Sequence, residues 1–443
     1  MTEILSRPPQ RRLRPAAATR LSTSRAAALY IGALLGPGLL LLPGLALAEA
    51  GPASVIAWAG LLVLSALFAL VFGALGRSFP SAGGVAGYVS VGFGHRAGQS
   101  TGYIFLAGVV TGAPVVCLIG AGYLTALTGG GQIARAVVAA LLLLTVLALA
   151  AGGLRTSSTA QLLLVGLLVV VIGAAVIGSA RAARAANWAP FAPHGWLAVG
   201  HAATTLMLSF VGWEAVAPLT SRLADPARQL ARVAGIALAV TSALYLGLAI
   251  ATVGVLGRGP GTLVPLAGLL ETAVGPAGAA GAAVAAVMLT LGATNAYING
   301  AAAMASALIQ RRSGTGTRAD RPATALLAVI AASGLLLITL YGFGLVSPAS
   351  MVALPTALFL SVYLGCMAAA ARLLRGPARW AALPAGSAVL IMLGYCGWAL
   401  AVPGIVAAAA GWRGRSRGPG TDTSAASRGL PSGEHRVRRR TRE

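Results

Sequence analysis

The sequence predicts an all-α polytopic membrane protein of about twelve transmembrane helices, and three observations support this fold class. Of the 443 residues, 57% are hydrophobic and only 9% are charged. The apolar runs reach the roughly 20 residues that a helix needs to cross the hydrocarbon core of a bilayer. The arginines collect on one side of the predicted spans, as they do in membrane proteins that follow the positive-inside rule.

Twelve spans follow from the apolar runs and the loops between them. The first six are Ala26–Ala48, Ala53–Gly76, Gln99–Leu127, Ile133–Gly153, Thr159–Ala180 and Leu197–Leu219. The second six are Arg232–Leu256, Gly275–Ile309, Ala323–Leu345, Pro348–Ala371, Trp380–Tyr395 and Trp398–Trp412. The eighth is longer than a membrane crossing requires, so part of it should lie outside the bilayer. The last two are short, and a single re-entrant pair is the alternative.

The arginine distribution sets the orientation. With a cytoplasmic N-terminus, the outer side receives only Arg135, Arg181, Arg184 and Arg258, and the cytoplasmic side receives the rest. This bias favours an even number of spans in the cell membrane with both termini cytoplasmic. Residues 1–25 and 413–443 are rich in Arg, Ser, Pro and Gly, so they are expected to be disordered basic tails.

A net charge of +23 would suggest a nucleic-acid partner in a soluble protein. Here the topology rule explains the arginines, so no nucleic acid is expected, and the tails either bind anionic lipid or only signal topology. Cys117, Cys366 and Cys396 lie in apolar segments and are interpreted as small hydrophobic residues, with no disulfide, metal or cofactor site. The N-terminus also resembles a secretory signal that ends at Ala46–Ala48, but the many spans that follow favour its retention.

The first span should not be one continuous helix. Gly36, Pro37 and Gly38 lie in its middle, and Pro37 removes a backbone donor and clashes with the preceding turn. Unpaired backbone at membrane depth persists only where it is buried in protein or lines a cavity. The second half-helix would then present free N–H groups to a buried anion, which is typical of a transporter's substrate site.

The sixth span contains the one acidic residue that lies deep in an apolar segment, Glu214. An ionised carboxylate in a membrane costs at least about 2–3 kcal/mol, so such residues usually serve a transport pathway or a proton site. A protonated glutamate that joins helices is the alternative. Gly212 lies among Phe210, Val211 and Trp213, where it either opens the backbone to a ligand or packs against another helix. Interrupted helices at corresponding positions of two halves favour the first interpretation.

Four polar residues are secondary candidates: Tyr103 and Thr111 on the third span, and Asn295 and Asn299 on the eighth. Such side chains either line a cavity or join helices, and the structural role is the more common one.

Three stretches of the sequence resemble the amino acid–polyamine–organocation superfamily of permeases, and most of all its bacterial branch that exports methionine and branched-chain amino acids. They are Gly36-Pro37-Gly38 with Pro43, residues 77–86 before the third span, and Phe210-Val211-Gly212-Trp213-Glu214 with residues 225–228. The stretch at 77–86 is the most specific, and the likeness covers roughly residues 26–310.

The resemblance implies a LeuT-like five-plus-five inverted repeat with discontinuous helices one and six. The repeats would be residues 26–180 and 197–371, followed by extra helices at 380–412. In this family the substrate carboxylate lies at the first break and its ammonium at the sixth. Carried over, Gly36, Pro37 and Gly38 would face the carboxylate, and residues 210–213 the amine and side chain. Glu214 matches a glutamate implicated in gating or proton response.

The function predicted from these features is a secondary transporter that exports neutral, apolar amino acids in exchange for protons by alternating access. A cationic substrate would require more buried acid than Glu214 alone. An uptake permease or exchanger of the same fold is the alternative. An integral membrane enzyme would need clustered ligands, whereas His95, His194, His201 and His435 are scattered. His194 and His201 could share one face near the outer surface, but no carboxylate is expected to accompany them. A channel is disfavoured by the asymmetric broken helices.

Overall fold

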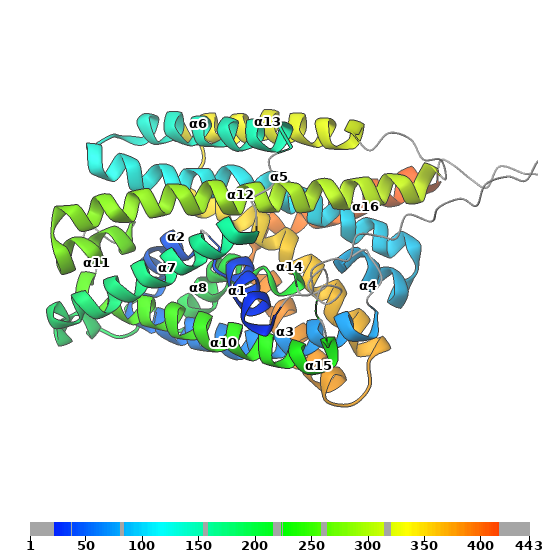
Figure 1. Ribbon diagram of the computed structural model, residues 1–443, viewed down its shortest axis with the longest axis horizontal. Helices are drawn as coiled ribbons and strands as arrows, with labels where there is room; N and C mark the ends of the chain where they lie inside the picture. The colour runs from blue at the N-terminus through cyan, green and yellow to red at the C-terminus, as the bar shows by residue number, and fades with distance from the viewer. Residues whose placement is uncertain are drawn as a thin grey trace, which may run out of the picture.

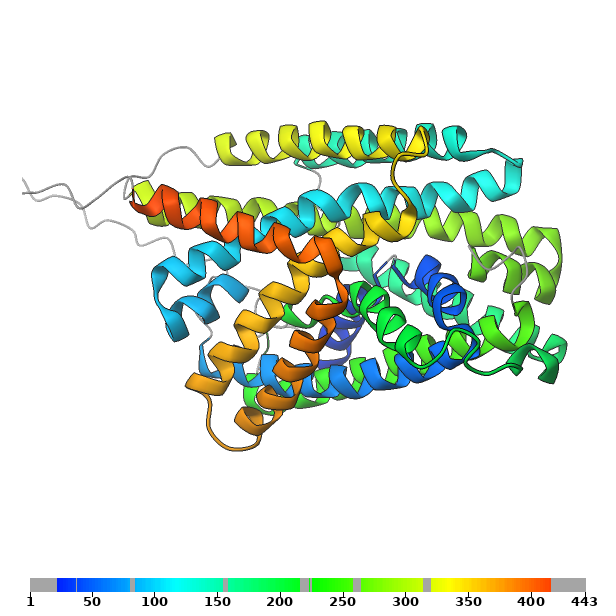
Figure 2. The same ribbon diagram turned by 180° about the vertical axis from the view of Figure 1, so that it is seen from behind.

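Helices account for nearly all of the regular structure in the computed structural model, which describes residues 22–36, 38–79, 84–153, 158–215, 223, 225–257, 264–313 and 320–415. Within these ranges, eight helical segments are long and apolar enough to cross a membrane, and shorter apolar helices accompany them. Most of the helices run roughly along the long axis of the molecule (Figures 1 and 2). The chain is therefore a polytopic membrane protein.

The first five expected spans are all present. The first is divided into α1 (Thr23–Leu34) and α2 (Gly38–Ala50), and a short 3-10 turn, η1 (Gly51–Ala53), leads into the second. The second to fifth are α3 (Ser54–Ser78), α5 (His95–Thr128), α6 (Gln132–Ala151) and α7 (Ser158–Ser179). Two further 3-10 turns, η2 (Ala180–Ala182) and η3 (Ala185–Trp188), follow the fifth span.

The second half repeats this pattern. The sixth span begins as α8 (Leu197–Leu206) and continues as the 3-10 turns η4 (Met207–Phe210) and η5 (Trp213–Ala215). The seventh to tenth are α10 (Pro226–Ala251) with the π-helical turn η6 (Thr252–Leu256), α12 (Pro276–Ser313), α13 (Asp320–Gly342) and α14 (Pro348–Leu373). The last two are α15 (Pro377–Tyr395) and η8 (Gly397–Leu400) with α16 (Ala401–Arg415).

Two short helices were not expected from the sequence. One is α4 (Gly84–Phe93), which lies before the third span, and the other is α11 (Pro265–Val274), which precedes the eighth span. Each apolar run is only 10 residues long, too short to be distinguished from a loop by its composition. The eighth span itself is one continuous helix of 38 residues, about 57 Å long, which exceeds the roughly 30 Å hydrocarbon core.

The two halves are arranged as inverted copies. The third and eighth spans, α5 and α12, pack side by side through the middle, and the fourth and ninth, α6 and α13, pack together at one edge (Figures 1 and 2). The short helices α4 and α11, which precede the third and eighth spans, lie at opposite ends of the molecule (Figure 1). Equivalent elements at opposite ends are the expected result when one half is turned over in the membrane plane.

Candidate functional site

The first span is interrupted where the sequence predicts it. After α1 ends at Leu34, the amide of Gly36 donates to the Leu34 carbonyl (2.8 Å), and the amide of Leu39 donates to the Gly36 carbonyl (3.1 Å). The glycine-flanked proline, Pro37, lies outside the described residues. Gly38 begins α2 in close contact with the other break, because a Cβ atom there would lie 2.8 Å from Ser209 Oγ.

The sixth span loses its α-helical backbone in the same region. Val211 is extended (φ −73°, ψ 135°), and Gly212 has a φ of +135°, which favours glycine. A Cβ atom on Gly212 would lie 2.5 Å from the carbonyl oxygen of Ala33, so the absence of a side chain lets this backbone touch the last turn of α1. The two breaks therefore meet directly, although they are far apart in the sequence.

Three buried tyrosines hold the open backbone. Tyr30 Oη of α1 donates to the Trp213 carbonyl (2.9 Å). Tyr245 Oη of α10 lies 2.7 Å from the Leu34 carbonyl and 2.8 Å from the Ser209 carbonyl, so its single hydrogen bridges both broken spans. Tyr363 Oη of α14 accepts from the amides of Gly212 (3.1 Å) and Trp213 (3.2 Å). Backbone groups that leave a helix at membrane depth need such partners.

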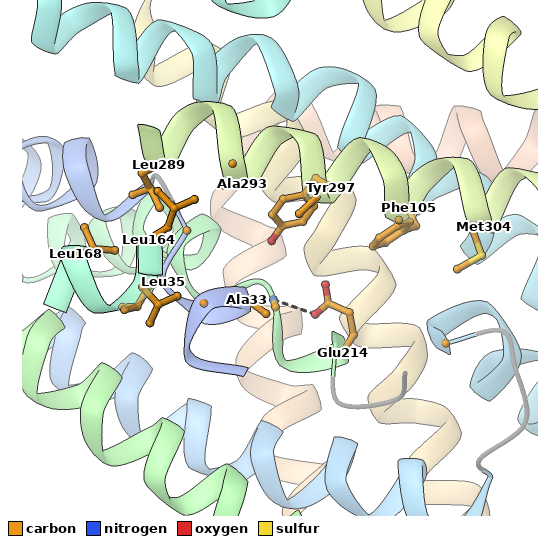
Figure 3. Close-up of a pocket in the computed structure, with 18 of the residues that line it drawn as sticks. Ala33, Leu35, Phe105, Leu164, Leu168, Glu214, Leu289, Ala293, Tyr297 and Met304 are labelled. Carbon is orange, nitrogen blue, oxygen red and sulfur yellow. Dashed lines mark hydrogen bonds between the residues drawn. The ribbon is translucent and has the colours of Figure 1, made fainter. Parts of the chain in front are cut away.

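Glu214 is tied into the same network. Its Oε2 atom accepts from the Gly212 amide (2.9 Å) and from the Tyr363 hydroxyl, so the carboxyl group folds back over the break in its own span. The side chain is only partly buried and faces a cavity (Figure 3). Glu214 is thus both a structural partner of the break and a titratable group at the cavity wall.

The cavity beside the breaks, here named the chamber, has a volume of about 370 Å³. Its walls come from α1, α4, α5, α7, α12 and the sixth span, and residues from most of these are labelled in Figure 3. Among the described residues that line it, Glu214 and Tyr297 carry the only polar side chains, and the others are glycine, alanine or larger apolar residues. Such a chamber suits an apolar group of a small molecule better than a second charge.

A smaller cavity of about 50 Å³, the inner pocket, adjoins the chamber. Gly36 and Tyr297 line both spaces, so they form the partition between them. Gly38, Val211 and Phe359 line only the inner pocket. The inner pocket is therefore enclosed by both breaks together with α5, α12 and α14.

The expected substrate residues have two kinds of environment. Gly36, Gly38, Val211 and Gly212 line one or both cavities. Phe210 instead packs against the rings of Trp58 and Tyr245, and the Trp213 indole Nε1 donates to Ser65 Oγ (3.2 Å). These two aromatic side chains lie behind the broken backbone and support it.

The secondary candidates lie around the cavities and do not line them. Thr111 Oγ1 donates to the carbonyl of Ala107 within its own helix (2.9 Å). Asn299 Nδ2 donates to Asn295 Oδ1 (3.0 Å) and to the Asn295 carbonyl (2.8 Å), while Tyr297 and Gly300 of the same helix face the chamber. Tyr103 is half-buried on α5 and is not among the described residues that line either cavity.

Sequence reasoning missed several residues that lie at the cavities and the breaks. Tyr297 at the partition and the tyrosines that hold the breaks carry no local signal, because the sequence does not show in which direction a tyrosine in an apolar span points. The expectation that no carboxylate accompanies the outer histidines was wrong. The Glu49 carboxylate, which accepts from Thr205 Oγ1 (2.9 and 3.1 Å), is close enough to His201 to interact with it electrostatically, because α2 packs against α8.

Comparison with known proteins agrees with this geometry. A family model described as amino acid permease matches residues 21–417. The uncharacterized amino acid permease YecA of Bacillus subtilis (strain 168) is 30% identical over 394 residues, which is 86% of this chain and 92% of that protein.

Two further likenesses are more limited. The L-methionine/branched-chain amino acid exporter YjeH of Escherichia coli (strain K12) is 44% identical over 96 residues, 22% of this chain and 23% of that protein. The crystal structure of MhsT in complex with L-phenylalanine superposes with a TM-score of 0.62 at 16% identity, covering 88% of this chain and all of that one (100%). At that identity the superposition establishes the fold alone, which is the LeuT-like five-plus-five repeat expected above.

Proposed function

The chain belongs to the amino acid permease family, and from this premise we propose that it carries neutral, apolar amino acids out of the cell in exchange for protons. It is an amino acid transporter and not an enzyme. The substrate class, the direction and the coupling ion are the proposal, and so are a place in the cell membrane and two cytoplasmic termini. Resemblance to the exporter from Escherichia coli over 96 residues supports the outward direction.

The proposed substrate class rests on the composition of the chamber wall. An amino acid zwitterion needs donors for its carboxylate and acceptors for its ammonium group, and interrupted helices offer both from their backbone. Gly36 and Gly38 lie at the first break, with Val211 and Gly212 facing them at the second. Apart from Glu214 and Tyr297, the described residues of the chamber wall are apolar, so a charged side chain on the substrate would lose its hydration and gain few partners in return.

Glu214 is the proposed proton carrier. It is the acidic residue at the chamber wall, and its hydrogen bond with the Gly212 amide links its protonation state to the backbone of the sixth span. A protonated carboxyl accepts fewer hydrogen bonds than a carboxylate, so proton binding weakens this link. Alternating access would then rock the first, second, sixth and seventh spans against the others.

Counterflow of labelled leucine and methionine in proteoliposomes, with and without a pH gradient, tests the proposal. The expected result is accumulation of both amino acids against unlabelled substrate, with net movement that responds to the pH gradient. Counterflow without any response to the gradient would leave an exchanger of the same fold as the function. If no amino acid moves at all, the proposal fails.

The alternative function of a different class is that of a membrane enzyme that acts on lipid-linked substrates. Family membership argues against it. In the part of the chain that the structure describes, no group of three or more His, Cys, Asp or Glu side chains is arranged to hold a metal ion.

A further inference from the structure

We propose that Arg135 forms a carboxylate-binding subsite at the outer end of the transport route, where an amino acid rests between the central site and the external solution. This inference rests on the proposed function, because it assigns a second station to the same substrate. Arg135 lies in the first turn of α6. The start of α6, next to the connection from α5, lies at the end of the molecule away from α4 (Figure 1).

The position of Arg135 is unusual for this chain. The outer side carries few arginines, since topology selects against them there. Arg181 and Arg184 on the same side are exposed, whereas Arg135 is half-buried. A partly desolvated guanidinium is costly unless it is paired, and none of the described carboxylates lies within ion-pair distance of it. It donates instead to a neutral group, the hydroxyl of Tyr341 at 3.3 Å.

A cavity of about 50 Å³, the outer pocket, lies directly against this guanidinium. The other described residues of its wall are apolar, apart from Tyr341. Gly122 of α5 lies beside the charge, since a Cβ atom there would be in ordinary van der Waals contact with the guanidinium, 3.5 Å from Arg135 Nε and 3.6 Å from Cζ. One water needs about 10–15 Å³, so a carboxylate has space beside the guanidinium. A guanidinium binds a carboxylate through two parallel N–H donors.

The outer pocket is also in line with the central site. Ile119 lines both the inner pocket and the outer pocket, so the two cavities share a wall. Gly36 and Tyr297 in turn separate the inner pocket from the chamber. The three cavities therefore form a series from the chamber, past the two breaks, to Arg135. An amino acid that leaves the breaks on the outer side meets a cation in an apolar wall.

Transport in vesicles of defined sidedness tests the subsite. With labelled leucine, Arg135→Gln should raise the half-saturating concentration at the outer face about tenfold or more, since it removes a charge-assisted hydrogen bond. The half-saturating concentration at the cytoplasmic face should stay within about twofold of the wild-type value. Arg135→Lys should keep part of the outer affinity. Arg181→Gln, a change of the same charge at an exposed outer arginine, should alter neither face.

Gln132→Ala separates binding from a structural role. It removes the hydrogen bond from Gln132 Nε2 to the Tyr341 carbonyl, which links α6 to α13, but leaves Arg135 and the wall of the outer pocket in place. The proposal expects this variant to keep the outer affinity. The proposal is overturned if Gln132→Ala reproduces the loss, or if Arg135→Gln leaves the half-saturating concentration at the outer face unchanged.

A second measurement distinguishes failure of the subsite from failure of the transport function. The probe is radiolabelled 4-methylpentanoate, which is leucine without its amino group. It should bind the purified wild-type protein, and Arg135→Gln should lose that binding. If the wild type binds the probe and Arg135→Gln does not, the subsite is supported. This holds even if the wild type moves no leucine, a result that would end the proposed function. If both proteins bind the probe equally, or if neither binds it, the subsite is overturned. Leucine transport by the wild type would still support the proposed function.

Discussion

At position 212 the chain requires a residue without a side chain for two separate reasons. The backbone there has a φ of +135°, which side chains strongly disfavour, and the space that a Cβ atom would fill is occupied by the Ala33 carbonyl. Gly36, at the equivalent break, meets neither constraint, because a Cβ atom added there would have no neighbour within 4 Å. The two glycines therefore have different roles, although the sequence presents them alike.

Gly212→Ala should destabilise the protein by about 1–3 kcal/mol or more, because the substitution adds backbone strain and a clash with α1. Thermal unfolding of the detergent-solubilised protein measures the effect. Gly36→Ala is the matched control and should leave the melting temperature nearly unchanged. Equal melting temperatures for the wild type and Gly212→Ala would contradict the close contact between the breaks.

Glu214→Gln should flatten the pH dependence of leucine transport and leave the protein folded. The amide keeps an oxygen that can accept from the Gly212 amide, but it cannot take up or release a proton. Transport rates between about pH 5.5 and 8 provide the profile. Glu271→Gln removes an exposed carboxylate outside the chamber and should keep the wild-type profile. An unchanged pH profile in Glu214→Gln would show that Glu214 has a purely structural role.

At the scale of elements, each broken span depends on partners from helices that are distant in the sequence. Tyr245 of α10 joins the end of α1 to the 3-10 turn of the sixth span, and Tyr363 of α14 binds the amides that follow. These contacts replace the hydrogen bonds that an unbroken helix would make internally. The breaks are therefore stabilised by tertiary structure, and their local sequence only permits them.

Tyr245→Phe should lower the stability by about 1–3 kcal/mol, because it leaves buried carbonyls without a donor. It should also weaken leucine binding, since both carbonyls belong to the segments that enclose the inner pocket. Tyr395→Phe is the control with the same chemical change, because Tyr395 is a half-buried tyrosine of α15 away from the breaks. The account of the breaks would be wrong if both variants melt and bind alike.

Sequence reasoning located the spans and both breaks for identifiable reasons. The apolar runs and the glycine–proline cluster at 36–38 are local signals, and Glu214 is conspicuous because acids are rare in apolar spans. Side-chain direction is not a local property, so Phe210 and Trp213 were expected at the site but lie behind it. The same limitation hid Tyr297 and Tyr363, as well as the hydrogen bond between Thr205 and the Glu49 carboxylate.

At the scale of the whole molecule, the inverted repeat brings the two breaks together near the middle of the fold. α5 and α12, the third span of each repeat, run past them and supply walls of both central cavities. The chamber and the outer pocket then lie on opposite sides of the breaks. An alternating-access carrier needs this arrangement, with a central site that can open to either side.

Equilibrium binding of labelled leucine to the purified protein tests most directly whether the chamber and its two breaks form the substrate site. Ala293 lies in the chamber wall on α12 (Figure 3), and Ala303 of the same helix is exposed on its outside. Ala293→Phe projects a ring into the chamber, whereas Ala303→Phe adds the same ring elsewhere. The account predicts saturable binding by the wild type and Ala303→Phe and loss of binding by Ala293→Phe. Wild-type affinity in Ala293→Phe, or no binding by the folded wild type, would contradict it.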